Sequence, residues 1–291
     1  MLSTLQQSVL ELFLFTTMSG IGLQVDWRDF VAVRPHKRVL LLSLLVNFVV
    51  IPLLGWAVTK LVAMPPVNAR ALIILACAPG GLSAVQFTSK SKDAQVFAGQ
   101  MAVLLTCLAI FISPLLMAFL LPPGTHLIVP YGQAVGYVSL FLLLPLAIGL
   151  AVRHAKTKLA LRLAAPIAFI GTGSFVLLII LTFSFRQTIM AEVSRPEMLG
   201  ITAFILAMMV IGWLSGGPRR ETRQVLAAAS SMRNVALAFA ITSRSFPNTG
   251  IEIPLAAFFA LMVTPNMILV LVLLGINKFK KPKRPQFANP G

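Results

Sequence analysis

The residues most able to do chemistry lie in the segment A-A-S-S-M-R-N-V-A-L-A-F-A (228–240), where Arg233 and Asn234 interrupt a run of small and apolar residues. A charge at the centre of a membrane-spanning helix costs about 2.5–3.5 kcal/mol on insertion scales, so such a residue faces the protein interior and has a partner or a task. Two tasks fit this guanidinium. It could pair with Glu11, the one acidic residue well inside an apolar run. It could instead bind an anionic substrate, in a bidentate manner if that substrate is a carboxylate.

A second interruption lies in residues 71–91, A-L-I-I-L-A-C-A-P-G-G-L-S-A-V-Q-F-T-S-K-S. Pro79, Gly80 and Gly81 at its centre cannot sustain a regular helix. A helix broken at membrane depth exposes N–H and C=O groups that lipid cannot satisfy, so they must line a cavity, an ion or a substrate. Half-helix N-termini attract anions, and exposed carbonyls coordinate cations. Polar side chains close to the two breaks could add ligands: Ser83, Gln86, Ser230, Ser231 and Asn234.

The two interrupted segments correspond in place and in ending. Residues 71–91 end in T-S-K-S, and residues 225–245 end in T-S-R-S. Aligned on that ending, Pro79 falls opposite Arg233 and Gly80 falls opposite Asn234. Interrupted segments at corresponding places in two oppositely oriented halves indicate an inverted-repeat transporter.

The elements that must position these breaks are membrane spans. The chain has 291 residues, of which 58% are hydrophobic and 11% are charged, with a mean hydropathy of +0.91. A soluble domain would carry about 25% charged residues. Apolar runs near 20 residues in length predict nine spans, at residues 5–24, 38–63, 70–89, 94–121, 128–154, 160–184, 196–215, 224–246 and 251–277.

The basic residues predict the orientation. Eighteen of the 24 Lys and Arg residues lie in one alternating set of loops and in the tail 278–291, against five on the other side. Because positive loops stay cytoplasmic, we expect a multi-pass protein of the cell (inner) membrane with its N-terminus outside and its C-terminus in the cytoplasm. The same rule favours a topology anchor as the role of the tail, and contact with anionic membrane lipid is the alternative.

Composition and motifs exclude several function classes. The net charge of +16 does not indicate nucleic acid, because the basic residues lie in short clusters between apolar runs and no nucleic-acid-binding motif is present. Cys77 and Cys107 fall inside apolar runs and predict neither a disulfide nor a metal pair. An enzyme would need a nucleophile, a metal cluster or an acid–base pair at membrane depth, and Glu11 and Arg233 form no such set. We therefore expect no catalytic residue, no resident metal and no cofactor, with a sodium ion as the open alternative.

Five motifs, in their order and spacing, resemble those of the bile acid:sodium symporter family: M-S-G-I-G-L-Q-V-D-W-R-D-F (18–30), N-F-V-V-I-P (47–52), A-P-G-G (78–81), S-P-L-L (113–116) and R-N-V-A-L-A (233–238). The resemblance covers nearly the whole chain. It implies an all-α polytopic membrane fold of about nine transmembrane helices, with an inverted repeat, two discontinuous crossing helices, and panel and core domains. The single transporter domain 1–291 would comprise repeat A (about 1–121), repeat B (about 128–277) and the basic tail. The panel would be the first, fifth and sixth spans.

The sequence departs from that family at the cation site. The resemblance implies an acidic residue and a glutamine in the second crossing helix, at positions that hold Ala229 and Arg233 here. A serine–asparagine pair in the first crossing helix is replaced by Ala84 and Val85. Asn47 stands where the family has a glutamine. The candidate ligands left for a cation are Thr106, Asn234 and Gln86.

These departures suggest that the Arg233 guanidinium lies roughly where a sodium ion would bind, holds the crossing together and keeps the cavity attractive to anions. The sequence therefore predicts a secondary active transporter of a small organic anion, a carboxylate or sulfonate, with weakened or absent sodium coupling and alternating access. Two alternatives stay open: a sodium/organic anion symporter that uses the remaining ligands, and an anion channel. The expected partners are the substrate and membrane lipid. The candidate substrate-binding residues are Arg233, Asn234, Pro79, Gly80, Gly81, Ser83, Ser230, Ser231 and Asn47.

Overall fold

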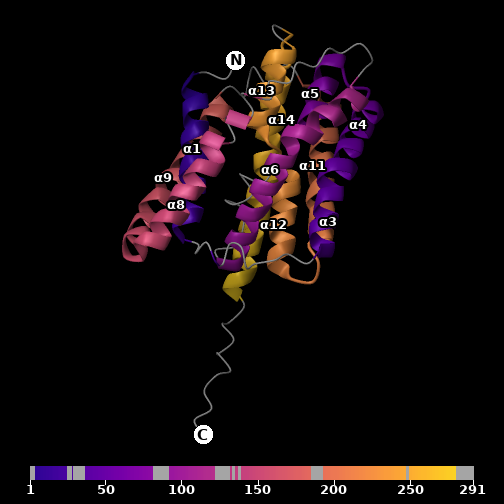
Figure 1. Ribbon diagram of the computed structural model, residues 1–291. Helices are drawn as coiled ribbons and strands as arrows, with labels where there is room; N and C mark the ends of the chain where they lie inside the picture. Colours follow the sequence, from indigo (N-terminus) through magenta and orange to yellow (C-terminus); the bar gives the residue numbers. More distant parts are fainter. Residues whose placement is uncertain are drawn as a thin grey trace.

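The computed structural model describes residues 4–24, 28, 37–80, 92–121, 132, 135–136, 139–184, 193–246 and 249–279, and these residues contain helices and no strand (Figure 1). The first half contains α1 (Thr4–Gln24), then α3 (Lys37–Leu45), the π-helical turn η1 (Val46–Val50) and α4 (Ile51–Leu61) in direct succession, then α5 (Pro66–Ala76) and α6 (Lys92–Leu120). The second half contains η3 (Ser139–Leu143), α8 (Leu144–Ala155), α9 (Thr157–Ser184), α11 (Arg195–Ser215), α12 (Arg220–Ser231), α13 (Val235–Ser245) and α14 (Glu252–Phe279).

Most of the predicted spans fall on these helices with ends that differ by a few residues, but α5 ends at Ala76, well before the predicted end of the third span at residue 89. Among the described residues, five helical stretches are long and apolar enough to cross a membrane: 37–61, 96–120, 157–177, 195–215 and 252–269. The prediction of an all-helical, multi-pass membrane protein is therefore confirmed. The eighth predicted span is two helices, α12 and α13. The third predicted span is described only as far as residue 80.

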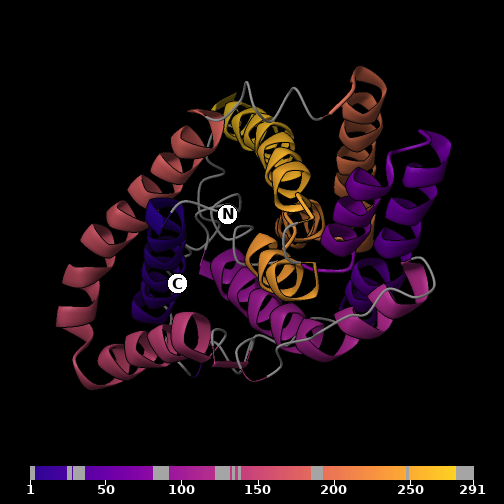
Figure 2. The same cartoon turned by 90° about the horizontal axis from the view of Figure 1, so that it is seen from above.

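Helices α1, α8 and α9 pack together on one side of the molecule, as the view from above shows (Figure 2). Gly22 of α1 and Gly149 of α8 let the two backbones meet, because a Cβ on Gly22 would lie 2.8 Å from the Gly149 Cα. The rings of Phe13 and Phe175 join α1 to α9, with centroids 5.1 Å apart. Glycines such as Gly22 and Gly149 permit the backbones of paired membrane helices to approach this closely. We call α1, α8 and α9 the three-helix group.

The remaining helices, α3 to α6 with η1 and α11 to α14, form a larger group. Helix α12 packs against α11 and α6, and α5 packs against α4 and α14. Gly212 of α11 faces the backbone of α12, where a Cβ would lie 2.9 Å from the Ala227 Cα. The main contacts between the two groups are those of α1 with α6 and of α9 with α14.

A buried carboxylate fixes one end of α5. Glu197 is 3% exposed and accepts hydrogen bonds from the Ser194 N–H at 2.8 Å and the Ser194 hydroxyl at 2.6 Å, which completes a capping box at the start of α11. Its other oxygen accepts from Asn68 Nδ2 of α5 at 2.7 Å. This hydrogen bond holds the start of α5 to the start of α11.

Candidate functional site

Two non-helical segments cross inside the larger group. Residues 77–80 follow α5, residues 232–234 separate α12 from α13, and all of them are buried. The N–H of Asn234 donates to the Ala78 carbonyl at 2.9 Å, which joins the two backbones directly. A Cβ on Gly80 would overlap a main-chain carbonyl oxygen of the other segment. Glycine at that position is what lets the two backbones cross so closely.

Arg233 fills this crossing. Its side chain is 2% exposed. Nε donates to the Leu75 carbonyl at 3.3 Å, and Nη1 donates to Asn47 Oδ1 at 2.9 Å. Nη2 donates to the Asn47 carbonyl at 3.5 Å and to the Ala76 carbonyl. Arginine has five N–H donors, so most of its hydrogen-bonding capacity is used by the protein.

The two acceptors from α5 are carbonyls at the end of a helix, where the last four C=O groups have no partner within the helix. Pro79 brings no N–H to the turn that follows. The helix dipole also places partial negative charge at this end. The guanidinium of Arg233 therefore caps the C-terminus of α5 from another part of the chain, and both its charge and its donors suit that position.

The Asn47 carbonyl is free because of the π-helical turn η1. The N–H of Ile51 donates to the Val46 carbonyl, five residues back. In that pattern the next donor would be Pro52, which has no N–H. The Asn47 carbonyl is thus left to Arg233. Single π-helical turns are rare in proteins and are frequent at functional sites.

Further buried side chains extend the network into α12 and α14. Asn47 Nδ2 donates to the Ser230 hydroxyl at 3.3 Å. The Ser231 hydroxyl donates to Asn266 Oδ1 at 2.7 Å, and Asn266 donates to a carbonyl of its own helix at 2.9 Å. Sequence reasoning missed Asn266, which is fully buried. The available signal was an asparagine inside an apolar span, directly after Pro265.

Asn234 caps α13. Its side-chain oxygen accepts from the Leu237 N–H at 3.0 Å, as an N-cap residue does. The N–H of Val235 donates to the Arg233 carbonyl at 3.0 Å. Two backbone N–H groups in the first turn of α13 therefore find acceptors in the two residues just before the helix.

The other predicted site residues differ in what surrounds them. Pro79 and Gly80 lie in the crossing. Thr106 of α6 is 2% exposed, and its hydroxyl has no hydrogen-bond partner in the part of the chain that the structure describes. The rest of the predicted site lies outside the described residues: Gly81, Ser83 and Gln86.

Among the described residues, the charge of Arg233 is met by oxygen dipoles and not by a carboxylate. Its hydrogen-bond acceptors in the described chain are main-chain carbonyls and one amide oxygen, and Glu11 is not among them. The described residues also hold no group of three His, Cys, Asp or Glu suited to a metal ion. A fixed positive charge in a low-dielectric interior exerts a field that water would otherwise weaken. These acceptors hold the Arg233 guanidinium in place at the crossing.

Comparisons with known proteins indicate transport. The family model described as "Sodium Bile acid symporter family" matches residues 11–193. The chain is 25% identical over 291 residues to the "Ileal sodium/bile acid cotransporter" of Mus musculus, covering 94% of this chain and 80% of that protein. It is 24% identical over 257 residues to a chloroplastic "Probable sodium/metabolite cotransporter" of Oryza sativa subsp. japonica, covering 85% and 60% of the two chains. It is 28% identical over 207 residues to the "P3 protein" of Homo sapiens, covering 68% and 42%.

Proposed function

The chain belongs to the sodium bile acid symporter family, and from that premise we propose that it is a secondary transporter of a small organic anion in which a fixed guanidinium replaces a bound sodium ion. The observation that carries this proposal is the burial of Arg233 among carbonyl oxygens at the crossing. Two of the relatives reported above are named as a sodium/bile acid cotransporter and a probable sodium/metabolite cotransporter. An anionic carboxylate or sulfonate as substrate is consistent with those names and with the charge of Arg233.

The acceptors around Arg233 are the kind that would otherwise hold a cation, because unwound carbonyls and half-helix C-termini coordinate Na⁺ in transporters. Here they already bind a cation that cannot dissociate. A sodium ion entering the crossing would also find no carboxylate at position 229, where a buried alanine stands. A site that stays occupied throughout the cycle cannot be coupled to the sodium gradient.

We propose that Arg233 acts on the substrate through its charge. Its donors are engaged by the protein, so a bidentate bond to a carboxylate would require some of them to be released. An anion beside the crossing would instead gain from the positive charge of Arg233, which has no carboxylate partner among the described residues. Direct contacts would then fall to the backbone near Gly80 and to neighbouring polar groups.

We further propose that the three-helix group and the larger group act as panel and core in alternating access. The hydrogen bonds of Arg233 join η1, α5 and α12, which all belong to the larger group. That group would therefore move as one unit. The contacts of α1 with α6 and of α9 with α14, which are fewer than those within each group, would change between the two arrangements. An inverted repeat of about 1–121 and 128–277 would supply the two alternating arrangements.

Sodium dependence tests the proposal without knowledge of the substrate. Purified protein would be melted in sodium, potassium and choline chloride, and equilibrium binding of radioactive sodium would be measured. We expect the wild type to give the same melting temperature in all three salts and no saturable sodium binding. Arg233→Ala should melt lower in choline and regain part of the loss in sodium, because the vacated carbonyls can take the ion. Arg233→Lys, which keeps the charge, should show no such gain.

Uptake into proteoliposomes gives the functional readout. A bile acid and a panel of small carboxylates and sulfonates should include at least one anion that enters equally well in sodium and in choline. Saturable sodium binding by the wild type, or uptake that stops in choline, would refute sodium independence.

A sodium symporter with its ion bound beside α6 is the second candidate function. It is favoured by the buried Thr106 hydroxyl, which has no hydrogen-bond partner among the described residues. If the wild type binds sodium and Thr106→Val, which keeps the shape of the side chain, does not, the ion site lies there. An anion channel is tested by counterflow, because only a carrier accelerates entry of labelled anion when unlabelled anion is present inside.

A further inference from the structure

The end of the α8–α9 hairpin is strongly basic. Lys156 alone joins the two helices, and Arg153, Lys158 and Arg162 lie within two turns of it. Residues 139–184 contain no Asp or Glu. These four basic side chains form no ion pair within the described chain, and one Arg153 guanidinium nitrogen, Nη1, is buried without a hydrogen-bond partner. We call these four residues the hairpin cluster.

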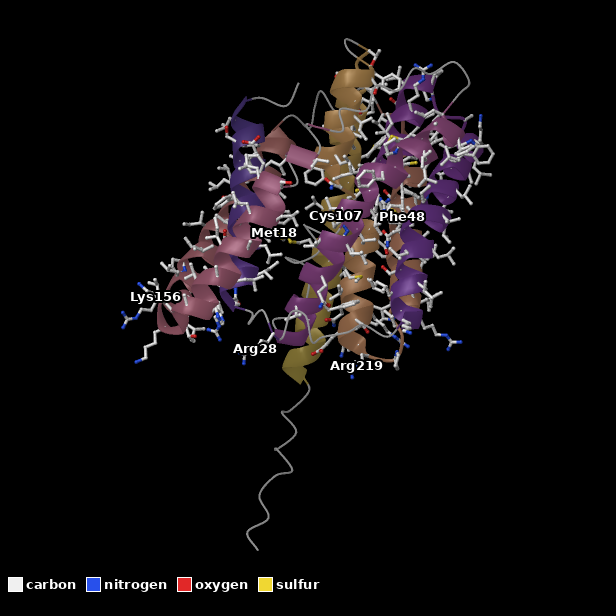
Figure 3. All side chains as sticks on the ribbon, in the orientation of Figure 1. Met18, Arg28, Phe48, Cys107, Lys156 and Arg219 are labelled. Carbon is white, nitrogen blue, oxygen red and sulfur yellow. The ribbon has the colours of Figure 1, made fainter. Side chains whose placement is uncertain are left out.

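The turn between α11 and α12 lies at the same end of the molecule but uses its charge differently. Figure 3 places Lys156, Arg28 and Arg219 at this common end. In the α11–α12 turn, Arg223 Nε donates to the Gly217 carbonyl at 2.5 Å, so one basic side chain there already serves the fold. Within the described ranges, no hydrogen bond or ion pair engages the side chains of the hairpin cluster, so its charge is available to a partner.

The surface beside the hairpin cluster is apolar. Ala160 and Ala164 face Leu23 of α1 in a small buried core, which fixes the inner face of α9. Leu159 and Leu163 are 42% and 38% exposed, and both Lys158 and Arg162 are exposed. The charged groups of Lys158 and Arg162 therefore lie next to an exposed aliphatic surface. That pairing matches a phospholipid, with its phosphate at the basic end and its acyl chains along the helix.

We propose that the hairpin cluster binds the headgroup of an anionic phospholipid, whose acyl chains lie against the exposed aliphatic side chains of α9. Basic residues next to the ends of membrane helices attract anionic lipid. A free phosphate would use the charges but not the neighbouring apolar surface, so a lipid fits both features. The lipid would be held by the three-helix group alone.

The experiment uses the purified full-length chain in detergent, with native mass spectrometry to count bound lipids. Phosphatidylglycerol is compared with phosphatidylcholine of the same acyl chains, and glycerol phosphate serves as the soluble headgroup. The test variant is Lys158→Gln with Arg162→Gln. The matched control is Arg219→Gln with Arg220→Gln, which removes the same charge from the larger group.

We expect the wild type to bind phosphatidylglycerol in preference to phosphatidylcholine, and the hairpin variant to lose about tenfold or more in affinity. The control variant should stay within about twofold of the wild type, and glycerol phosphate should not displace the lipid. Equal losses in the two variants would show unspecific attraction and overturn the site. Equal binding of the two lipids, or displacement by glycerol phosphate, would also overturn it.

Discussion

The two broken segments that cross inside the larger group contribute opposite hydrogen-bonding groups to their contact. Residues 77–80 follow a helix whose end presents carbonyl acceptors, and they contribute Pro79 without an N–H and Gly80 without a side chain. Residues 232–234 contribute donors, namely the Arg233 guanidinium and the Asn234 N–H. One segment is the acceptor and the other is the donor.

This difference shows how a crossing can be complete without a mobile ion. Carbonyls exposed by a broken helix need positive charge or donors, since lipid supplies neither. In this chain the second segment carries both into the first. The complementarity depends on one side chain, Arg233, and on one close backbone approach, at Gly80, so a substitution at either should weaken it.

Removing the donor should have the largest effect. Arg233→Leu leaves the Ala76 and Asn47 carbonyls buried without their Arg233 donor, while the Leu75 carbonyl keeps the Ala78 N–H at 3.1 Å. We expect a loss of stability on the order of 3 kcal/mol, since each unpaired buried acceptor is costly. The measurement is unfolding in detergent, with Arg233→Lys as the control that keeps the charge. A leucine variant as stable as the wild type would mean that these bonds contribute nothing net.

The next largest loss of stability is expected from a side chain added to the acceptor segment, residues 77–80. Gly80→Ala puts a Cβ onto the carbonyl oxygen of Met232, and backbone atoms cannot move aside as a flexible side chain would. We expect a loss of about 1–3 kcal/mol, as for overpacked cores. Gly173→Ala on α9 is the matched control, because nothing lies within 4 Å of its Cβ position. If both alanine variants unfold alike, the segments do not cross as closely as described.

The positions of most helices and of the two broken segments could be predicted from the sequence. Hydropathy placed most of the helices to within a few residues. Pro79, Gly80 and Arg233 marked the two breaks, because each is unfavourable in the middle of a membrane helix. The burial of Arg233 also followed from the cost of its charge.

The partners of Arg233 could not be predicted in the same way. Two of them are main-chain carbonyls of Leu75 and Ala76, and a carbonyl has no identity in a sequence. The role of Asn47 depends on a π-helical turn, which shifts the hydrogen-bond register by one residue and has no simple sequence pattern. Asn266 was missed because its contact with Ser231 joins helices α12 and α14, whose relative placement only the fold reveals.

An intermediate effect is expected from a substitution that neutralises the charge of Arg233 and keeps an oxygen acceptor at position 47. Asn47→Asp preserves an oxygen for Nη1 but places a carboxylate opposite the guanidinium. We expect a modest loss of stability, because aspartate lacks the Nδ2 that donates to the Ser43 carbonyl and the Ser230 hydroxyl. We expect affinity for the transported anion to be lower by on the order of tenfold, because the field of Arg233 is neutralised. Asn47→Ala is the comparison, since it removes the acceptor without adding charge and should lower stability more than anion affinity. The reverse pattern would mean that Arg233 binds the anion through its donors.

The smallest effect is expected at Asn234, although it is the neighbour of Arg233. Its link to the first segment is a main-chain N–H, which no ordinary substitution removes, while its side chain only caps α13 through the Leu237 N–H. Asn234→Ala should therefore cost about 1 kcal/mol, the usual value of an N-cap, and Asn234→Ser should restore most of it. Unfolding in detergent measures both variants, and sodium-free anion uptake should persist in each. A loss as large as that of Arg233→Leu, or a new requirement for sodium, would place the Asn234 side chain in the crossing itself.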